Sequence, residues 1–222
     1  GTYLNPTTLL ATVINEDAPG RIRITKQDAL DQHTIAGVQF DIYSVDEDGN
    51  AIDRVAQMTT NEQGIAESPD LFPADYIVRE HANPTGYEDT LWSEKITVGM
   101  DELVTRTVTN MPIQGVIRIV KTDSLTHEPL AGVVFTVTRL SAPAGSNGAA
   151  VGSVVATLTT GADGCAETDW LEWGRYRIEE TAVPAHYVDA PFQTEIDCFE
   201  GGKTYEIAAA NEPTKGWLRL TK

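Results

Sequence analysis

Each half of this 222-residue chain carries a lysine, a glutamate and an asparagine inside runs of alternating apolar residues. The first set is Lys26, Glu80 and Asn110, and the second is Lys121, Glu180 and Asn211. Successive side chains of a strand point to opposite faces, so Lys26 shares the face of Ile22 and Ile24, which must point into the core. The same alternation turns the other five polar side chains inward, although Arg106 interrupts the apolar run that leads to Asn110.

Two kinds of chemistry are compatible with a buried set of this composition. One is a structural Lys–Glu ion pair capped by Asn, which adds no net stability over apolar residues. The other is covalent: desolvation lowers the pKa of a lysine, so its neutral amine becomes a nucleophile, while a buried glutamic acid stays protonated. The acid would polarise the Asn carbonyl group and pass a proton to the departing nitrogen. Ammonia would leave, and a Lys–Asn isopeptide bond would remain.

The elements that would hold these residues form an internal repeat. The opening segment 20–26 (GRIRITK) returns at 115–121 (GVIRIVK) and again at 216–222 (GWLRLTK). Three further pairs match in the same order, namely IAGVQF with LAGVVF, YIVRE with YRIEE, and NMP with NEP. The spacing between copies grows across the Gly- and Ala-rich stretch 141–153, which we interpret as a loop insertion.

Three repeat junctions but only two complete units are recognisable, which predicts domains at 16–112 and 113–213. Residues 1–15 are expected to be the end of a preceding repeat or a linker, and residues 214–222 the first strand of a following repeat. The parent protein should therefore be a longer array. Asn15 and Lys222 match the motif as well, but each lacks its partners here, so both are expected to be unreacted.

Each unit is expected to be all-β. Val, Ile, Thr, Phe and Tyr fall in short alternating runs separated by turn signals such as Asp48-Gly49-Asn50, and no window keeps a helical period for long. Regular short strands over about 95 residues are typical of an antiparallel β-sandwich.

The four ordered motifs, repeated over nearly the whole chain, resemble the Cna B-type, or SpaA-like, domains of Gram-positive surface adhesins and pilins. The resemblance implies tandem β-sandwiches of inverse-immunoglobulin topology, in which a first-strand lysine bonds to a last-strand asparagine under catalysis by a glutamate. Matched by position, the resemblance assigns one cross-link to Lys26 and Asn110 and the other to Lys121 and Asn211. It assigns the catalytic role to Glu80 in the first unit and to Glu180 in the second. One departure is His186, which stands where the first unit has Gly86.

Composition and the resemblance together limit the partners and the cellular location expected for this chain. The formal net charge of −17 repels phosphate backbones and anionic lipids, so nucleic acid is not an expected partner. The longest apolar stretch, 148–158, is too short to cross a bilayer, so no membrane insertion of this fragment is expected. The resemblance implies an extracellular location, on the cell wall or cell surface of a Gram-positive bacterium.

The expected function is a structural stalk segment of an adhesin or pilin, monomeric, with neighbouring repeats as partners. An alternative is an adhesive module that recognises a host matrix protein or glycan, for which 141–153 is the best candidate loop. A third is an accessory domain of an extracellular enzyme. No cofactor or metal is expected, because the four histidines have no ligand spacing, and no turnover on an external substrate is expected. The four tryptophans could form an aromatic platform for a sugar, but packing in a core or between domains is the commoner role of this residue. They are Trp92, Trp170, Trp173 and Trp217.

The two cysteines stand where the first unit has apolar residues. Cys165 matches Ile65, and Cys198 matches Val98. The coincidence of two replacements suggests that the cysteines are in contact. A disulfide within the second unit and a pair of buried free thiols are the two alternatives.

Overall fold

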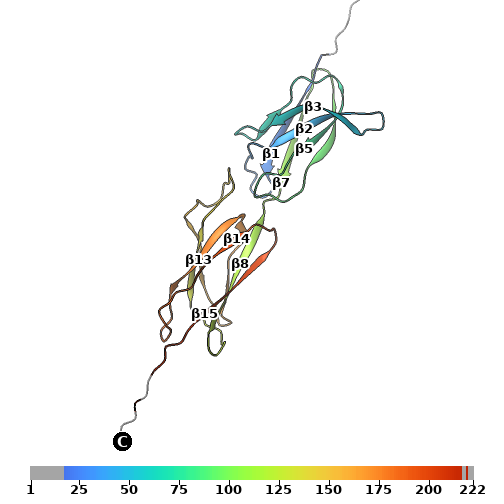
Figure 1. Cartoon of the computed structure of the whole chain (residues 1–222). Coiled ribbons are helices and arrows are strands. Elements are labelled where there is room, and N and C mark those ends of the chain that lie inside the picture. The colour runs from blue at the N-terminus through green and yellow to red at the C-terminus, as the bar shows by residue number, and fades with distance from the viewer. Residues whose placement is uncertain (1–17, 217–218, 220–222) are drawn as a thin grey trace, which may run out of the picture.

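The structure is a computed structural model and describes residues 18–216 and 219. The predicted segment 1–15 and most of the predicted segment 214–222, including Asn15 and Lys222, lie outside these residues. The described residues contain fifteen strands and no helix. Figure 1 shows them as two sandwiches placed end to end, which confirms the expected all-β tandem architecture.

The first sandwich has seven strands. They are β1 (Arg21–Asp28), β2 (Gln39–Val45), β3 (Ala51–Thr59), β4 (Ile65–Glu67), β5 (Ala74–Glu80), β6 (Ser93–Val98) and β7 (Leu103–Asn110). One sheet has the order β4-β1-β7, and the facing sheet has the order β3-β2-β5-β6.

The second sandwich repeats this arrangement with one short additional strand. Its strands are β8 (Gln114–Asp123), β9 (Val134–Arg139), β10 (Val154–Thr159), β11 (Cys165–Glu167), β12 (Leu171–Glu172), β13 (Gly174–Ala182), β14 (Gln193–Cys198) and β15 (Thr204–Asn211). One sheet has the order β10-β9-β13-β14, and in the other β8 pairs with β11, β12 and β15.

The first and last strands of each sandwich are hydrogen-bonded neighbours that run in parallel. In the first sandwich this is the pair β1 and β7, and in the second it is β8 and β15, whereas every other ladder between strands is antiparallel. A parallel pair needs a long crossover connection. Here the rest of the domain supplies it, so the chain enters at one end of the sandwich and leaves at the other.

Alternation along the strands builds a separate apolar core in each sandwich. Phe40, Ile42 and Val78 are fully buried in the first, and Phe135 and Val137 are fully buried in the second. Each such side chain stabilises the fold by about 1.5–3 kcal/mol relative to an exposed one. The Lys, Glu and Asn side chains of each unit are buried in these cores.

A glycine turn fixes the backbone beside each buried lysine. Gly64 and Gly164 both adopt positive φ, at 70° and 72°, which favours a residue without Cβ. The Lys26 N–H donates to the Gly64 carbonyl oxygen at 2.8 Å, and the Lys121 N–H donates to that of Gly164 at 2.8 Å. These contacts hold the lysine backbone against the turn before β4 or β11.

Candidate functional site

The three predicted residues of the first unit meet inside its core. Lys26 and the Glu80 side chain are fully buried, and Asn110 is 1% exposed. Lys26 Nζ donates to Asn110 Oδ1 at 2.5 Å and lies 3.4 Å from Glu80 Oε2. Asn110 Nδ2 donates to Glu80 Oε1 at 2.9 Å. The contacts form a closed triangle of amine, carboxyl group and carboxamide.

The second unit contains the same triangle. Lys121 Nζ donates to Asn211 Oδ1 at 2.5 Å and to Glu180 Oε2 at 3.0 Å. Asn211 Nδ2 donates to Glu180 Oε1 at 2.7 Å. An ordinary N–H···O contact is about 2.7–3.2 Å long, so in both units the amine and the amide oxygen lie closer than usual hydrogen-bond partners.

Strand pairing explains why residues so far apart in sequence meet. In the parallel register of β1 and β7, Lys26 pairs with Val108 and Asp28 pairs with Asn110, so Lys26 and Asn110 lie two pairs apart on the same inward face. Glu80 ends β5 in the facing sheet, where it pairs with Phe40. The triangle therefore spans the two sheets at one end of the sandwich.

Burial sets the protonation preference of both lysines. Desolvation lowers the pKa of Lys26 and of Lys121 below the ordinary 10.5, and the neighbouring Glu80 or Glu180 opposes this only in part. Aromatic rings complete the surroundings: Lys121 Nζ lies 5.7 Å from the ring centre of Phe135 and 6.0 Å from that of Phe192. A lowered pKa increases the fraction of neutral amine, the form that acts as a nucleophile.

The glutamates face a different amide atom from the one expected. Sequence reasoning placed the carboxyl group first at the Asn carbonyl oxygen, but in both units it contacts the amide nitrogen, and the lysine amine contacts the oxygen. Each carboxyl group therefore bridges the lysine amine and the amide nitrogen and does not contact the amide oxygen.

Two neighbouring contacts were missed by the sequence reading, and they differ between the units. In the first unit, Asn83 Oδ1 accepts a second hydrogen bond from Asn110 Nδ2 at 3.3 Å. In the second unit, the Phe192 N–H donates to Glu180 Oε2 at 3.2 Å. Asn83 gives no sequence signal because Asn before Pro is common in loops, and the Phe192 contact comes from the backbone.

Arg106, which interrupts the apolar run, does not disturb the last strand of the first unit. It lies at the edge of the sandwich, where its Nε donates to Glu94 Oε1 at 2.6 Å, and β7 continues unbroken to Asn110. A long side chain at an edge position can bring its charge to solvent.

The cysteines are two separate free thiols, and the expected contact between them is absent from the structure. Cys198 is fully buried in the core, and burial raises its pKa to about 12. Cys165 lies on β11, on the outer side of its sheet, where its Sγ is 3.5 Å from Arg118 Nη2. The Cys165 side chain points away from the core and the Cys198 side chain points into it, so the two cysteines do not form a disulfide.

The tryptophans do not gather into one platform among the described residues. Trp92 packs against the first core, edge-on to Phe40 at 6.0 Å, while Trp173 stacks on Phe199 at 4.4 Å in the second unit. Trp170 is 57% exposed. Trp217 lies outside the described residues.

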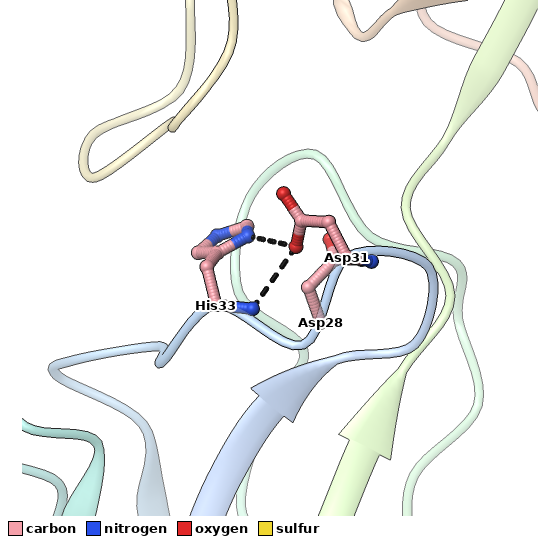
Figure 2. A group of neighbouring side chains, drawn as sticks. All are labelled: Asp28, Asp31 and His33. Atoms are coloured by element: carbon pink, nitrogen blue, oxygen red, sulfur yellow. Dashed lines mark hydrogen bonds and ion pairs between the residues drawn. The ribbon is translucent and has the colours of Figure 1, made fainter.

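A polar cluster near the end of the first unit was also missed. Asp28, Asp31 and His33 place one ligand-type atom each within 4.8 Å of one another (Figure 2). His33 Nδ1 is 2.6 Å from Asp31 Oδ1, and its Nε2 is 3.3 Å from the Tyr87 hydroxyl group. Asp28 Oδ1 accepts from the Leu30 N–H at 2.7 Å. These side chains satisfy one another and the β1–β2 loop, which explains their proximity structurally.

The fold and the buried sets define a class: tandem prealbumin-like sandwiches, each with an interior Lys, Glu and Asn. The SpaA prealbumin-like fold domain model matches residues 20–112 and again 115–213, so the chain belongs to this family. No curated protein sequence matches the chain. The described residues contain no helix long and apolar enough to cross a membrane.

Solved structures show the same fold at low sequence identity. The Bacillus anthracis TIE protein is 23% identical with a TM-score of 0.70, and the match covers 87% of this chain and 34% of that one. This chain therefore spans about a third of that relative. A C-terminal fragment of the pilus adhesin SpaC from Lactobacillus rhamnosus GG is 17% identical with a TM-score of 0.60, covering 89% of this chain and 99% of the fragment.

Proposed function

We propose that this chain is a stalk segment of a Gram-positive surface adhesin or pilus, with each sandwich locked by an autocatalytic Lys–Asn isopeptide bond. The observation that carries the proposal is the occurrence of the same buried triangle in both units. A structural ion pair would use Asn only as a cap, whereas the carboxamide, whose oxygen lies 2.5 Å from the amine, also supplies an electrophilic carbon next to that oxygen. Family membership supports a location outside the cell.

The reaction follows from the contacts of the first unit. The neutral Lys26 Nζ attacks Asn110 Cγ, and an N–C bond forms. The protonated Glu80 gives its proton through Oε1 to Nδ2 and takes one from the amine through Oε2, the atoms it already contacts. The bond between Cγ and Nδ2 breaks, one ammonia leaves, and one amide has replaced another with no oxidant or cofactor. Glu80 returns to its starting state.

Each domain performs this reaction once and on itself, so it is a self-modification without turnover on an external substrate. Glu180 would serve Lys121 and Asn211 in the same way. Holding the reactants in contact converts a slow bimolecular aminolysis into an intramolecular step. Exclusion of water from the core removes the competing hydrolysis of the amide.

The cross-link would change how the domain carries load. The chain enters at the start of β1 and leaves at the end of β7, and Lys26 and Asn110 are 84 positions apart. With the bond in place, tension would pass from β1 through the side chains of Lys26 and Asn110 into the next unit. The intervening residues would then bear none of it, which suits a stalk.

Intact-mass spectrometry tests the proposal. The wild-type fragment should weigh two ammonia molecules less than its sequence, and Glu80→Ala or Glu180→Ala should each restore one. Glu179→Ala, which alters a neighbouring partly exposed carboxyl group, is the matched control and should leave both losses in place. A wild-type mass equal to that of the sequence would refute the cross-links and leave the ion-pair interpretation.

An adhesive module is the second candidate function. It is favoured by the loop 141–153, because part of this loop, Pro143 to Asn147, lines a cavity at the junction of the two units. A screen against host matrix proteins and glycans, with the loop intact and shortened, tests it. Binding that survives the shortened loop would place the adhesive surface elsewhere.

A further inference from the structure

A cavity of about 580 Å³ lies where the two sandwiches meet. The first unit contributes the loop after β1 and the segment Pro84 to Tyr87, and the second contributes Pro143 to Asn147, Glu172 and Trp173. This volume falls within the range of about 300–1,000 Å³ that is usual for ligand sites. Neither unit alone encloses it.

The polar side chains of the cavity are mainly acidic. Asp28, Asp31, Glu62 and Glu172 line it, and none of its described lining residues is Lys or Arg. Asp31 and Glu62 are exposed to solvent and line the cavity. Glu172 is paired with Arg139 behind the wall at 2.8 Å. Asp31 Oδ1 is contacted by His33 Nδ1 at 2.6 Å, but Asp31 and Glu62 are both exposed carboxylates whose charge attracts a cation.

The remaining wall is apolar and aromatic. Leu30, 54% exposed, and Pro143 lie beside Tyr87 and Trp173 in the lining. The Trp173 ring is held by stacking on Phe199, with 16° between the planes. A ligand that fits must combine an aliphatic stem with a cationic head, because such a group covers apolar surface and also meets carboxylates and aromatic faces.

The inserted loop is fastened in place rather than free. Arg139 is 1% exposed and donates to the carbonyl oxygens of Ser141 and Ala149 and to Ser146 Oγ. The equivalent residue of the first unit is Ser44, which makes no such contacts. A loop held in one conformation presents a preformed wall, which lowers the entropic cost of binding.

We propose that this cavity binds an arginine side chain of an extended peptide segment from another protein. The planar guanidinium group matches carboxylates such as Asp31 and Glu62 and stacks on aromatic rings, which an ammonium group does less well. The proposal rests on the second candidate function and names the chemistry of its ligand. It does not depend on the isopeptide bonds.

Titration with a capped Gly-Arg-Gly peptide, followed by ¹H–¹⁵N NMR on the full fragment, tests this inference. The matched ligands carry citrulline, which has the same shape without the charge, or lysine. The arginine peptide should cause saturable shifts at the cavity residues. The citrulline peptide should bind about tenfold more weakly than the arginine peptide, and the lysine peptide should be weakened by a smaller factor. Intact mass measured on the same samples reports separately on the cross-links.

Paired variants locate the site. Asp31→Asn with Glu62→Gln should weaken arginine binding by about tenfold. Glu47→Gln with Asp48→Asn removes the same charge from the exposed β2–β3 turn and should change it by less than about twofold.

Three results would overturn the proposal. The first is equal binding of the arginine and citrulline peptides. The second is equal weakening by the two variant pairs. The third is a response to Zn²⁺ alone, abolished by His33→Gln, without a response to the arginine peptide, because the cluster of Figure 2 would then be a metal site.

Discussion

The two sandwiches are nearly identical at their buried triangles and differ at the ends that face their neighbours. The amine-to-oxygen distance is 2.5 Å in both, and the glutamate contacts the same two nitrogens. By contrast, Arg139 and its anchored loop replace Ser44, and His186 replaces Gly86. The interior chemistry is held constant while the junctions vary, so stability and recognition should respond to different substitutions.

Removal of a glutamate proposed to be catalytic should give the largest effect, and the effect should be the same in both units. The proposed bonds close loops of 84 and 90 positions, so each would stabilise its unit by about 4–5 kcal/mol. In calorimetry, Glu80→Ala should lower the melting temperature of the first unit by roughly 20–30 °C and leave the second unchanged, and Glu180→Ala should do the reverse. A variant that melts like the wild type would show that its unit is not cross-linked.

Loss of the side chain that anchors the loop should affect the stability of the second unit much more than that of the first. Arg139→Ala removes several buried hydrogen bonds and should destabilise the second unit by about 2–4 kcal/mol, whereas Ser44→Ala should change the first by less than about 0.5 kcal/mol. Urea unfolding measures both. Arg139→Met, which keeps the apolar stem, should destabilise the second unit by less than Arg139→Ala does. Proteolytic cleavage within 141–153 should become faster in both Arg139 variants. Equal costs for the Ala and Met variants would assign the effect to the lost hydrogen bonds and ion pair alone, because the retained apolar stem would then contribute nothing.

The pH dependence of the uncross-linked protein should be alike in both units. In the Glu80→Ala/Glu180→Ala double variant, burial still lowers the pKa of Lys26 and Lys121, while the unfolded chain keeps the ordinary 10.5. Between the lowered value and 10.5 the unfolded state binds more protons, so stability rises with pH by up to about 1.4 kcal/mol per pH unit and lysine. Urea denaturation over this window measures the slope. A flat profile would mean that the amines reach water.

The left-handed residue at the equivalent loop positions 86 and 186 should give the smallest difference. His186 has φ of 75°, and Gly86 has φ of 93°. His186→Gly relieves this strain and should stabilise the second unit by about 0.5–1 kcal/mol. Gly86→Ala should destabilise the first by about 1–2 kcal/mol, because its Cβ would also lie 2.8 Å from Pro143 Cγ. Thermal unfolding detects both, and a destabilising His186→Gly would show that the histidine side chain contributes contacts of its own.

Strand alternation and the repeat were enough to predict the sandwiches and the residues of both triangles. Alternation fixes which face a side chain occupies, and that was the only property needed to turn Lys26 and Asn110 inward. It does not fix which strands pair, so the parallel alignment of β1 with β7 followed only from the structure. Nor does it fix which amide atom Glu80 contacts, because that depends on side-chain rotation.

The cysteines and the inserted loop show where position matching fails. Ile65, the counterpart of Cys165, is itself only partly buried at a sheet edge, so equivalence to an apolar residue did not imply a core position. The stretch 141–153 has a composition typical of flexible loops, and its order comes from Arg139, a charged residue at the end of β9. Buried contacts of this kind leave no periodic signal in the sequence.

The complete burial of Lys26 and Lys121 has a consequence for quality control in the proposed stalk. In water each amine would stay charged and inert, so the bond can form only after the sandwich has closed around it. A chain that misfolds would therefore never be sealed and would stay open to degradation, whereas a correctly folded one would become permanent. The covalent bond would thus act as a record that folding had succeeded.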